Sequence, residues 1–428
     1  MKIYKIVLLG IIFLMHFAGY SQDKQAITLE DVLKIGGASN LTIKEYNELQ
    51  NLALAESKQA KSWWLPEIYT GAKTHNLWGT AMNTDGRFFD GLATENFWAG
   101  LGLNVMLDVG DHIFKAKASS LRLEASMHLT QSKRNEVLLK NIKLYYNSLQ
   151  FQLEMIAHQE LVKQSKNIVD QITIRVDAGL TYESDLLLAK SNNSYLQTKA
   201  LEAKIAFVTS LSLLQEQLNI APTTQLVCAD TVLTTLALNV VETSLEDTYK
   251  KRPEVKYLEL YEQSLVVEKK TYTTGLLIPS IQAGTNIGVF GKPVSPLANQ
   301  GVLNFGLMWK IPLAELGFGG MNKIYQSKIA LSQIKLEQTK NHINQEVIES
   351  KQTLILYTTI LKLAEDAQTF SKKGLQQSLE RQQLGTAKIL EVFQMQQAYL
   401  KARLAYTNAV IRYNLTQYNL FVAMGNNL

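Results

Sequence analysis

The sequence has very few of the residues that would give it cross-links, nucleic-acid contacts or membrane-spanning helices. Cys228 is the only cysteine among 428 residues, so no disulfide can form within the chain. The net charge of +5 is small for this length, which argues against nucleic-acid binding. Beyond residue 21 we find no apolar run of about 18 residues, so any membrane insertion would be made by strands.

Catalytic and metal-binding patterns are also missing. The six histidines are scattered, and none pairs with a carboxylate or a cysteine at metal-ligand spacing. Gly291-Lys292 is followed by Pro293, and no glycine precedes it at phosphate-loop spacing. We therefore expect no enzyme activity, no cofactor and no metal.

The first 21 residues have the pattern of a secretory signal. Lys2 and Lys5 precede an apolar stretch over 6–18, and Gly19-Tyr20-Ser21 puts small residues at the −3 and −1 positions of a cleavage site. The alternative is a permanent anchor, for which the apolar stretch is short. No lipobox cysteine follows, and we predict that 1–21 is removed on export.

Proline is absent between 111 and 221 and after 312, which permits very long helices there. A proline in a helix interior costs about 3 kcal/mol. Apolar residues in these stretches recur every three, four or seven positions, as in coiled-coil-like seams. The isolated glycines Gly179 and Gly385 mark chain reversals. We therefore predict two helical hairpins, with tips at 176–181 and 382–387.

The expected helices fall into a long and a short class. The long ones are 111–175 and 321–381, and the short ones are 41–65, 182–219, 254–274 and 388–424. At a rise of about 1.5 Å per residue, the two short helices of each half together nearly match the long one. We therefore expect them to stack end to end beside it.

Glycine is concentrated in two windows that predict strands. Sixteen of the 24 glycines lie in 67–110 and 275–320. The expected strands are about 67–76, 97–108, 280–290 and 302–311. In these segments apolar residues alternate with small or polar ones, at best over about 11 residues, which is the pattern of a bilayer-crossing barrel strand. All five tryptophans lie in or beside the windows, as an interfacial girdle would place them. The alternative is a soluble sheet with one face on a core.

Four strands cannot close a membrane barrel. Known spanning barrels start at about eight strands, and an open edge in lipid leaves backbone groups unpaired. We therefore predict an α+β membrane protein that oligomerises through its strands, and three copies would supply twelve.

The two halves of the chain share landmarks at a nearly constant offset. The pairs are Leu65-Pro66 with Ile278-Pro279, Gly102 with Gly306, Arg175-x-x-x-Gly179 with Arg381-x-x-x-Gly385, and Asp185 with Glu391. Their common order indicates one duplicated unit of long helices and two strands, with a first repeat at 22–242 and a second at 243–428.

These landmarks resemble those of the TolC family of outer-membrane efflux proteins. The resemblance extends over essentially the whole mature chain and includes the segments Ile27–Leu33 and Arg252-Pro253-Glu254. It implies a homotrimer in the cell outer membrane, with a twelve-stranded β-barrel in the lipid and a long α-helical tunnel in the periplasm. It also implies a periplasmic adaptor and a proton-driven inner-membrane pump as partners.

The resemblance implies roles for the hairpin tips. Glu391 lies where the family has the first of two aperture acids, and Asp185 is its counterpart in the first repeat. Gln394 stands at the second position in place of an acid, which puts a doubled acidic ring in doubt. The tip residues placed for adaptor contact are Arg175, Gly179, Arg381 and Gly385. The alternative for Glu391 and Gln394 is a solvated helix surface. For Arg175 and Arg381 it is a charge placed at a helix C-terminus, where the dipole favours it.

The expected function is the passive exit duct of a tripartite efflux system that exports small molecules. Two alternatives stay open at this point: the exit duct of type I protein secretion, and a periplasmic coiled-coil scaffold without a pore.

Overall fold

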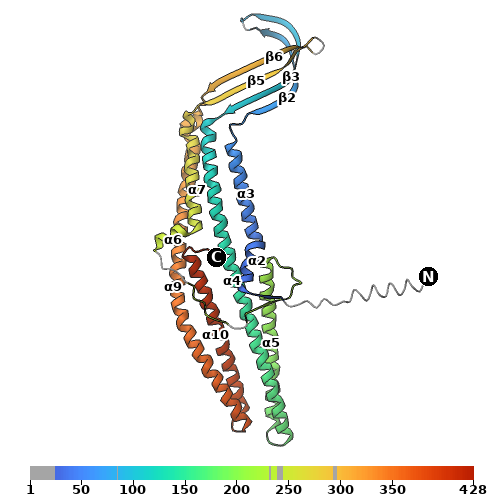
Figure 1. Cartoon of the computed structure of the whole chain (residues 1–428), viewed down its shortest axis with the longest axis vertical. Coiled ribbons are helices and arrows are strands. Elements are labelled where there is room, and N and C mark those ends of the chain that lie inside the picture. Colours follow the sequence, from blue (N-terminus) through green and yellow to red (C-terminus); the bar gives the residue numbers. More distant parts are fainter. Residues whose placement is uncertain (1–24, 84, 231–232, 239–243, 293–295) are drawn as a thin grey trace, which may run out of the picture. The chain divides into compact units, whose positions relative to one another are not determined.

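The computed structural model describes residues 25–83, 85–230, 233–238, 244–292 and 296–428 (Figure 1). The expected signal at 1–21 and the boundary between the expected repeats lie outside them. The described residues form two compact units, which we call the helical unit and the sheet unit. The helical unit contains the described parts of Met1–Glu45, Ser132–Arg252 and His342–Leu428, and the sheet unit contains those of Tyr46–Gln131 and Pro253–Asn341.

The main elements occur in the same order in both halves of the chain. The first half has α3 (Leu41–Lys61), β2 (Glu67–Met82), β3 (Phe88–Leu107), α4 (Val109–Asp177) and α5 (Glu183–Leu218). The second half has α7 (Pro253–Lys269), β5 (Ser280–Gly291), β6 (Ala298–Met308), α9 (Gly320–Gln383) and α10 (Ile389–Ala423). The long helices α4 and α9 have 69 and 64 residues. No helix among the described residues is long and apolar enough to cross a bilayer.

The main helices and strands are connected by short elements. They are β1 (Gln25–Ile27), α2 (Leu29–Ser39), β4 (Leu226–Cys228), α6 (Leu245–Lys251), η1 (Lys270–Tyr272), η2 (Thr274–Leu277) and α8 (Leu313–Phe318). The helix expected over 254–274 ends at Lys269 and continues as η1 and η2. At η2, Gly275 lies so close to Gly110 that a Cβ on Gly110 would come within 2.0 Å of the Gly275 carbonyl oxygen. This close approach requires glycine on both sides.

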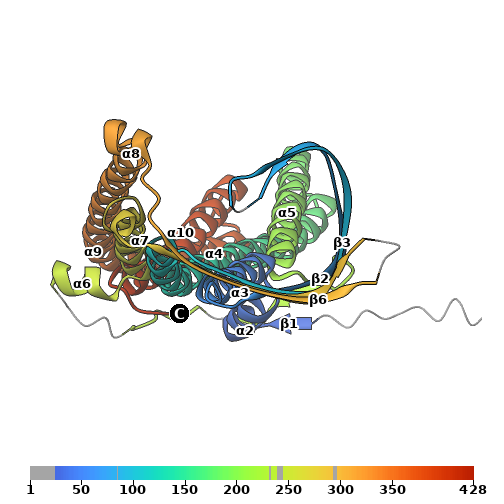
Figure 2. The ribbon, with the colours of Figure 1, turned by 90° about the horizontal axis from the view of Figure 1, so that it is seen from above.

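The four long strands form one antiparallel sheet in the order β2-β3-β5-β6. β2 and β3 are longer than the strands expected at 67–76 and 97–108, because their hairpin continues past an irregularity at Gly79, where φ is +102°. β6 ends at Met308 and not at 311, since Lys310 leaves the strand to bind Asp108. Seen from above, the sheet is strongly curved (Figure 2).

The pairing register assigns each side chain to one of two faces. In β3, Leu101, Leu103 and Val105 lie on one face, and Trp98, Gly100 and Asn104 lie on the other, because successive residues of a strand alternate. The paired residues of the other strands follow the same division, with Leu303 and Phe305 on the first face. We call these the apolar face and the polar face. Both Leu303 and Phe305 are exposed in the single chain.

The core of the helical unit lies where α2, α4, α5 and α10 meet the small sheet β1-β4. Its buried members include Ile27, Val32, Ile142, Tyr145, Leu214 and Ile411. The side chain of Gln152 donates to the carbonyl of Cys228 and accepts from its amide, both at 2.9 Å, and so pairs with β4 as a further strand would. Burial and the nearby charge of Asp230 raise the pKa of the Cys228 thiol to about 12.

Two buried polar side chains of the helical unit bind carbonyls in the last turns of its helices. Asn40 accepts from the amides of Thr42 and Ile43 at the start of α3 and donates to the carbonyl of Gln217, in the last turn of α5, at 2.7 Å. Arg252, immediately before α7, donates to the carbonyl of Val422, in the last turn of α10, at 3.0 Å. Each half therefore uses a polar side chain to satisfy one free carbonyl at a helix C-terminus.

Candidate functional site

The two hairpin tips of the helical unit have the same backbone turn. Gly179 and Gly385 have φ of +71° and +73°, which favours glycine because it has no Cβ. The amide of Leu180 donates to the carbonyl of Arg175 at 2.8 Å, and the amide of Thr386 donates to that of Arg381 at 2.8 Å. This bonding pattern ends a helix with a left-handed residue and satisfies its last carbonyls.

Arg175, at the end of α4, reaches the other hairpin. Its Nη1 donates to the carbonyl oxygen of Gln382, in the last turn of α9, at 3.0 Å. Its Nη2 would lie 2.8 Å from a Cβ built on Gly385. The guanidinium thus fills the space over Gly385 and places a positive charge at a helix C-terminus, where it is stabilising. The structure brings together two predicted tip residues from different repeats.

The other residues predicted at the tips form local contacts. Arg381 Nη1 and Glu391 Oε1 form an ion pair at 2.6 Å that spans the turn of the second hairpin. Asp185 accepts from the hydroxyl of Thr181 at 2.9 Å across the turn of the first. Gln394 is exposed on α10. The sequence pattern predicted the positions of these residues, but the contact between the hairpins was not among the predictions.

An apolar cluster lies beneath the tips and is formed by three helices. Its buried members are Ile168, Ile172, Leu186, Ala189, Ile389, Val392 and Phe393. Gln396, one turn further along α10, is only 1% exposed, and neither atom of its amide has a hydrogen-bond partner among the described residues. An unpaired buried amide costs about 1–3 kcal/mol. This glutamine was missed from the sequence, although its spacing three residues after Phe393 puts it on the apolar stripe.

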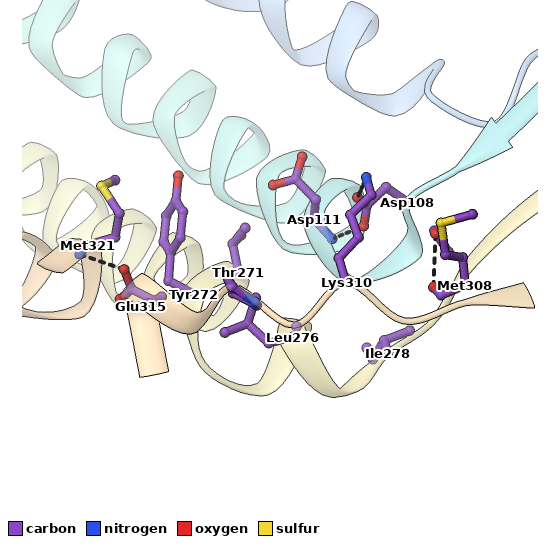
Figure 3. Close-up of a pocket in the computed structure, with 13 residues that line it drawn as sticks. Asp108, Asp111, Thr271, Tyr272, Leu276, Ile278, Met308, Lys310, Glu315 and Met321 are labelled. Carbon is purple, nitrogen blue, oxygen red and sulfur yellow. Dashed lines mark hydrogen bonds and ion pairs between the residues drawn. The ribbon is translucent and has the colours of Figure 1, made fainter. Parts of the chain in front are cut away.

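A second site lies in the sheet unit, where strands turn into long helices (Figure 3). It is a cavity of about 400 Å³. Lys310 donates to Asp108 at 3.1 Å, and Asp108 in turn accepts from the amide of Asp111 in the first turn of α4 at 3.3 Å. The Glu315 carboxylate accepts from the amides of Met321 and Asn322, at 3.0 and 2.9 Å, at the start of α9.

The carboxylates of this junction therefore cap helices. Partial burial by itself lowers the pKa of the neighbouring Lys115, but the hydrogen bond and charge of Asp111, at 2.7 Å, more than offset it and raise that pKa. A carboxylate at a helix N-terminus is stabilised by the free amides and the helix dipole. We interpret the junction as a structural joint between the strands and the long helices.

One family model matches part of this chain. The model of the family described as outer membrane efflux protein matches residues 38–219, which lie within the first expected repeat. No match was found among curated proteins. In the described parts of the chain, no group of three or more His, Cys, Asp or Glu residues is placed to hold a metal ion.

Solved structures share the fold at low sequence identity. The CmeC outer membrane channel of Campylobacter jejuni is 16% identical, with a TM-score of 0.79, and the alignment covers 93% of this chain and 85% of that chain. VceC of Vibrio cholerae is 12% identical over 93% and 96% of the two chains, with a TM-score of 0.76. The MtrE outer membrane channel of Neisseria gonorrhoeae, in its open state, is 14% identical over 93% and 89%, with a TM-score of 0.75.

Proposed function

Since the chain belongs to the outer membrane efflux protein family, we propose that it is the channel subunit of a tripartite efflux system. In this role it is a passive duct through which small molecules leave across the outer membrane. The sheet would lie in the outer membrane and the helical unit in the periplasm. The family membership confirms the resemblance noted in the sequence.

The two-faced sheet is the observation that carries this proposal. Its four strands leave β2 and β6 as edges, with one apolar and one polar face. An open edge in lipid leaves amides and carbonyls unpaired, which is costly. Three copies joined edge to edge would give a closed barrel of twelve strands, with the apolar face toward lipid and the polar face toward a wet lumen.

The proposed partners supply energy and connection. A proton-driven inner-membrane pump would provide the driving force, and a periplasmic adaptor would dock at the hairpin tips that contain Gly179 and Gly385. The side chains of Arg175 and Arg381 would lie at or near the interface with the adaptor. A conduit of this kind needs no chemistry of its own.

The aperture would lie at the same end. We assign Glu391, Gln394 and Asp185 to its lining, with the Arg381–Glu391 ion pair at 2.6 Å holding the second hairpin in its resting conformation. Opening would require the Arg175 hydrogen bond to Gln382 to break as the hairpins untwist apart. Two polar contacts are weak enough for docking energy to exceed them.

Electron microscopy of the detergent-purified full chain tests the architecture. We expect a three-fold cylinder with a detergent belt at one end. A soluble monomer would contradict the proposal and favour a scaffold without a pore. Export of an unfolded polypeptide by the reconstituted system would instead favour type I secretion.

Conductance in planar bilayers tests the aperture. Glu391→Ala and Gln394→Ala should each raise the conductance, because both remove polar side chains from the narrowest part. The matched controls are Glu365→Ala and Gln397→Ala, exposed residues of the same types on α9 and α10. Equal conductance in all four variants would remove the aperture assignment and leave the duct intact.

A further inference from the structure

The polar face of the sheet carries a groove of about 470 Å³ whose lining comes from all four strands. The lining residues are Tyr69, Lys73, His75, Asn96, Trp98, Asn286, Phe290, Gln300 and Val302. The pairing register puts every one of them on the same face, for example through the pairs Lys73–Trp98 and Trp98–Phe290. The contacts at the hairpin tips do not involve this groove.

A row of paired glycines crosses the same face of the sheet. Gly71, Gly100 and Gly288 are direct partners across β2, β3 and β5. A Cβ on Gly100 would lie 2.8 Å from Cζ2 of Trp98, and one on Gly288 would lie 3.0 Å from its Nε1. The indole therefore lies against the glycine backbone. A larger residue at either glycine would meet both the indole and the backbone of the neighbouring strand. Aromatic rings covering strand glycines stabilise both partners.

A second ring is seated in the same manner. A Cβ on Gly102 would lie 2.2 Å from Cζ of Tyr69, so the phenol ring covers this glycine. The centroids of the Tyr69 and Trp98 rings are 6.5 Å apart. Phe290, directly across from Trp98, adds a third ring. The groove is thus a platform of aromatic faces that is fixed by the backbone beneath it.

The charge of the lining has one sign. Lys73 and His75 are its titratable side chains that can carry positive charge, and the lining includes no aspartate or glutamate. Three carboxamides complete it, those of Asn96, Asn286 and Gln300. The side-chain oxygen of Asn286 has no hydrogen-bond partner among the described residues. A carboxamide can donate or accept, so it can bind a polar substituent of a ligand.

We propose that this groove is a cargo subsite for organic anions that carry a flat ring system. Rings of the cargo stack on Trp98 and Tyr69, and its anionic group pairs with Lys73. A groove of this size accommodates a small molecule. The inference deepens the proposed function, because it assumes that the polar face lines the lumen. Three copies of the chain would then hold three such subsites on the exit path.

Binding of 2-naphthalenesulfonate to the detergent-purified full chain, measured by calorimetry, tests the subsite. We expect saturable binding that is weakened about tenfold by Lys73→Met, which removes the charge, and about tenfold by Trp98→Leu, which removes the stacking surface. Two other probes separate the contribution of the charge from that of the ring. We expect 2-naphthylmethylammonium, with the same ring and the opposite charge, and sulfate, with charge and no ring, to bind at least tenfold more weakly.

Matched controls guard against detergent partition and misfolding. Trp78→Leu removes an exposed tryptophan of β2 on the apolar face, and Lys335→Met removes an exposed lysine of α9. Neither should change the affinity. Lys73→Arg and Trp98→Phe should retain binding within about threefold, because charge and ring are kept.

Equal affinity for the anionic and the cationic probe, or no binding by the unaltered chain, overturns the subsite. Loss of affinity in the Trp78 variant equal to that in the Trp98 variant overturns it as well. Conductance of the ligand-free protein reports separately on the duct. A conducting protein without probe binding removes the subsite alone. A non-conducting protein that binds the probe removes the duct and, with it, the cargo role of the groove.

Discussion

The two hairpin tips share a backbone and differ in what they present to solvent. In the first, Leu180 and Tyr182 are 70% and 80% exposed. The residues at the corresponding turn positions of the second are Thr386 and Lys388, which are polar, and the second turn has one exposed apolar side chain, Leu384 at 79%. Leu187 is exposed on α5, whereas Phe393, its counterpart on α10, is buried in the apolar cluster.

This difference separates two tasks that one turn geometry can support. Exposed apolar side chains at a rigid turn are typical of protein contact surfaces. Buried aromatic rings and ion pairs such as Arg381–Glu391 are typical of a region that is held in one conformation. We infer that the first hairpin is shaped for docking and the second for closure. The following predictions test this division, from the largest expected effect to the smallest.

Gly385→Ala should destabilise the protein more than Gly179→Ala does. Both glycines have positive φ, for which an alanine costs roughly 1–2 kcal/mol. At Gly385 the new methyl would also displace the Arg175 guanidinium, whereas no described atom lies within 4 Å of a Cβ at Gly179. We expect a total cost of about 3 kcal/mol against about 1 kcal/mol. Thermal unfolding followed by circular dichroism measures it, and equal losses would contradict the Arg175 contact.

Leu180→Ser should weaken adaptor binding far more than Thr386→Ser does. Truncating a buried apolar anchor of an interface costs about 2 kcal/mol or more, which is roughly thirtyfold in affinity. Thr386→Ser keeps a hydroxyl at the matching position. Surface binding of the periplasmic adaptor measures the effect. Stronger loss from the second hairpin would reverse the division of tasks.

Arg175→Met should cost more stability than Arg381→Met. The Arg175 guanidinium hydrogen-bonds to a backbone carbonyl in a partly buried setting, and a bond of this kind contributes about 1.5 kcal/mol. The Arg381–Glu391 pair is largely exposed and contributes about 0.2–1 kcal/mol. Chemical unfolding in detergent measures the two losses. A larger loss of stability from Arg381→Met would indicate that the main stabilising contact lies within the second hairpin.

Gln396→Met should stabilise the protein by about 1 kcal/mol. Methionine has a similar length and carries no amide that needs a partner, so the buried unpaired atoms disappear. The counterpart of Gln396 in the first hairpin is Lys190, which is exposed, and Lys190→Met should change stability by less than about 0.5 kcal/mol. A drop in melting temperature for Gln396→Met would indicate that the amide is satisfied.

Much of this fold follows from where proline and glycine fall. Long helices need proline-free sequence, and α4 and α9 occupy the two proline-free stretches. The first hairpin of strands was underestimated, because the irregularity at Gly79 interrupts the alternation on which strand prediction depends. The end of β6 was overestimated. Alternation continues through Trp309 and Ile311, but Lys310 is held by Asp108, a contact across 202 residues that no local pattern contains.

The hairpin tips also show that local sequence patterns do not predict long-range contacts. Gly179 and Gly385 were found from the sequence, because a left-handed turn leaves a glycine at a fixed position. The partner of Arg175 is a backbone carbonyl, which every residue type carries, so no sequence pattern specifies it. Whether Glu391 and Gln394 line an aperture stays a prediction. Gln396 lies three residues after Phe393 on the buried side of α10, and this spacing was the signal that the sequence offered.

The two halves of the chain share one core in the helical unit, which has a consequence for folding. The core of the helical unit starts at Ile27 and includes Ile411 of the last helix. The carboxamide of Asn414 in that helix donates to the carbonyl of Thr234 and accepts from the amide of Leu236, both at 2.9 Å. A nascent chain that lacks its last 35 residues therefore lacks one wall of this core. We expect the core of the helical unit to form only after the last helix has been synthesised.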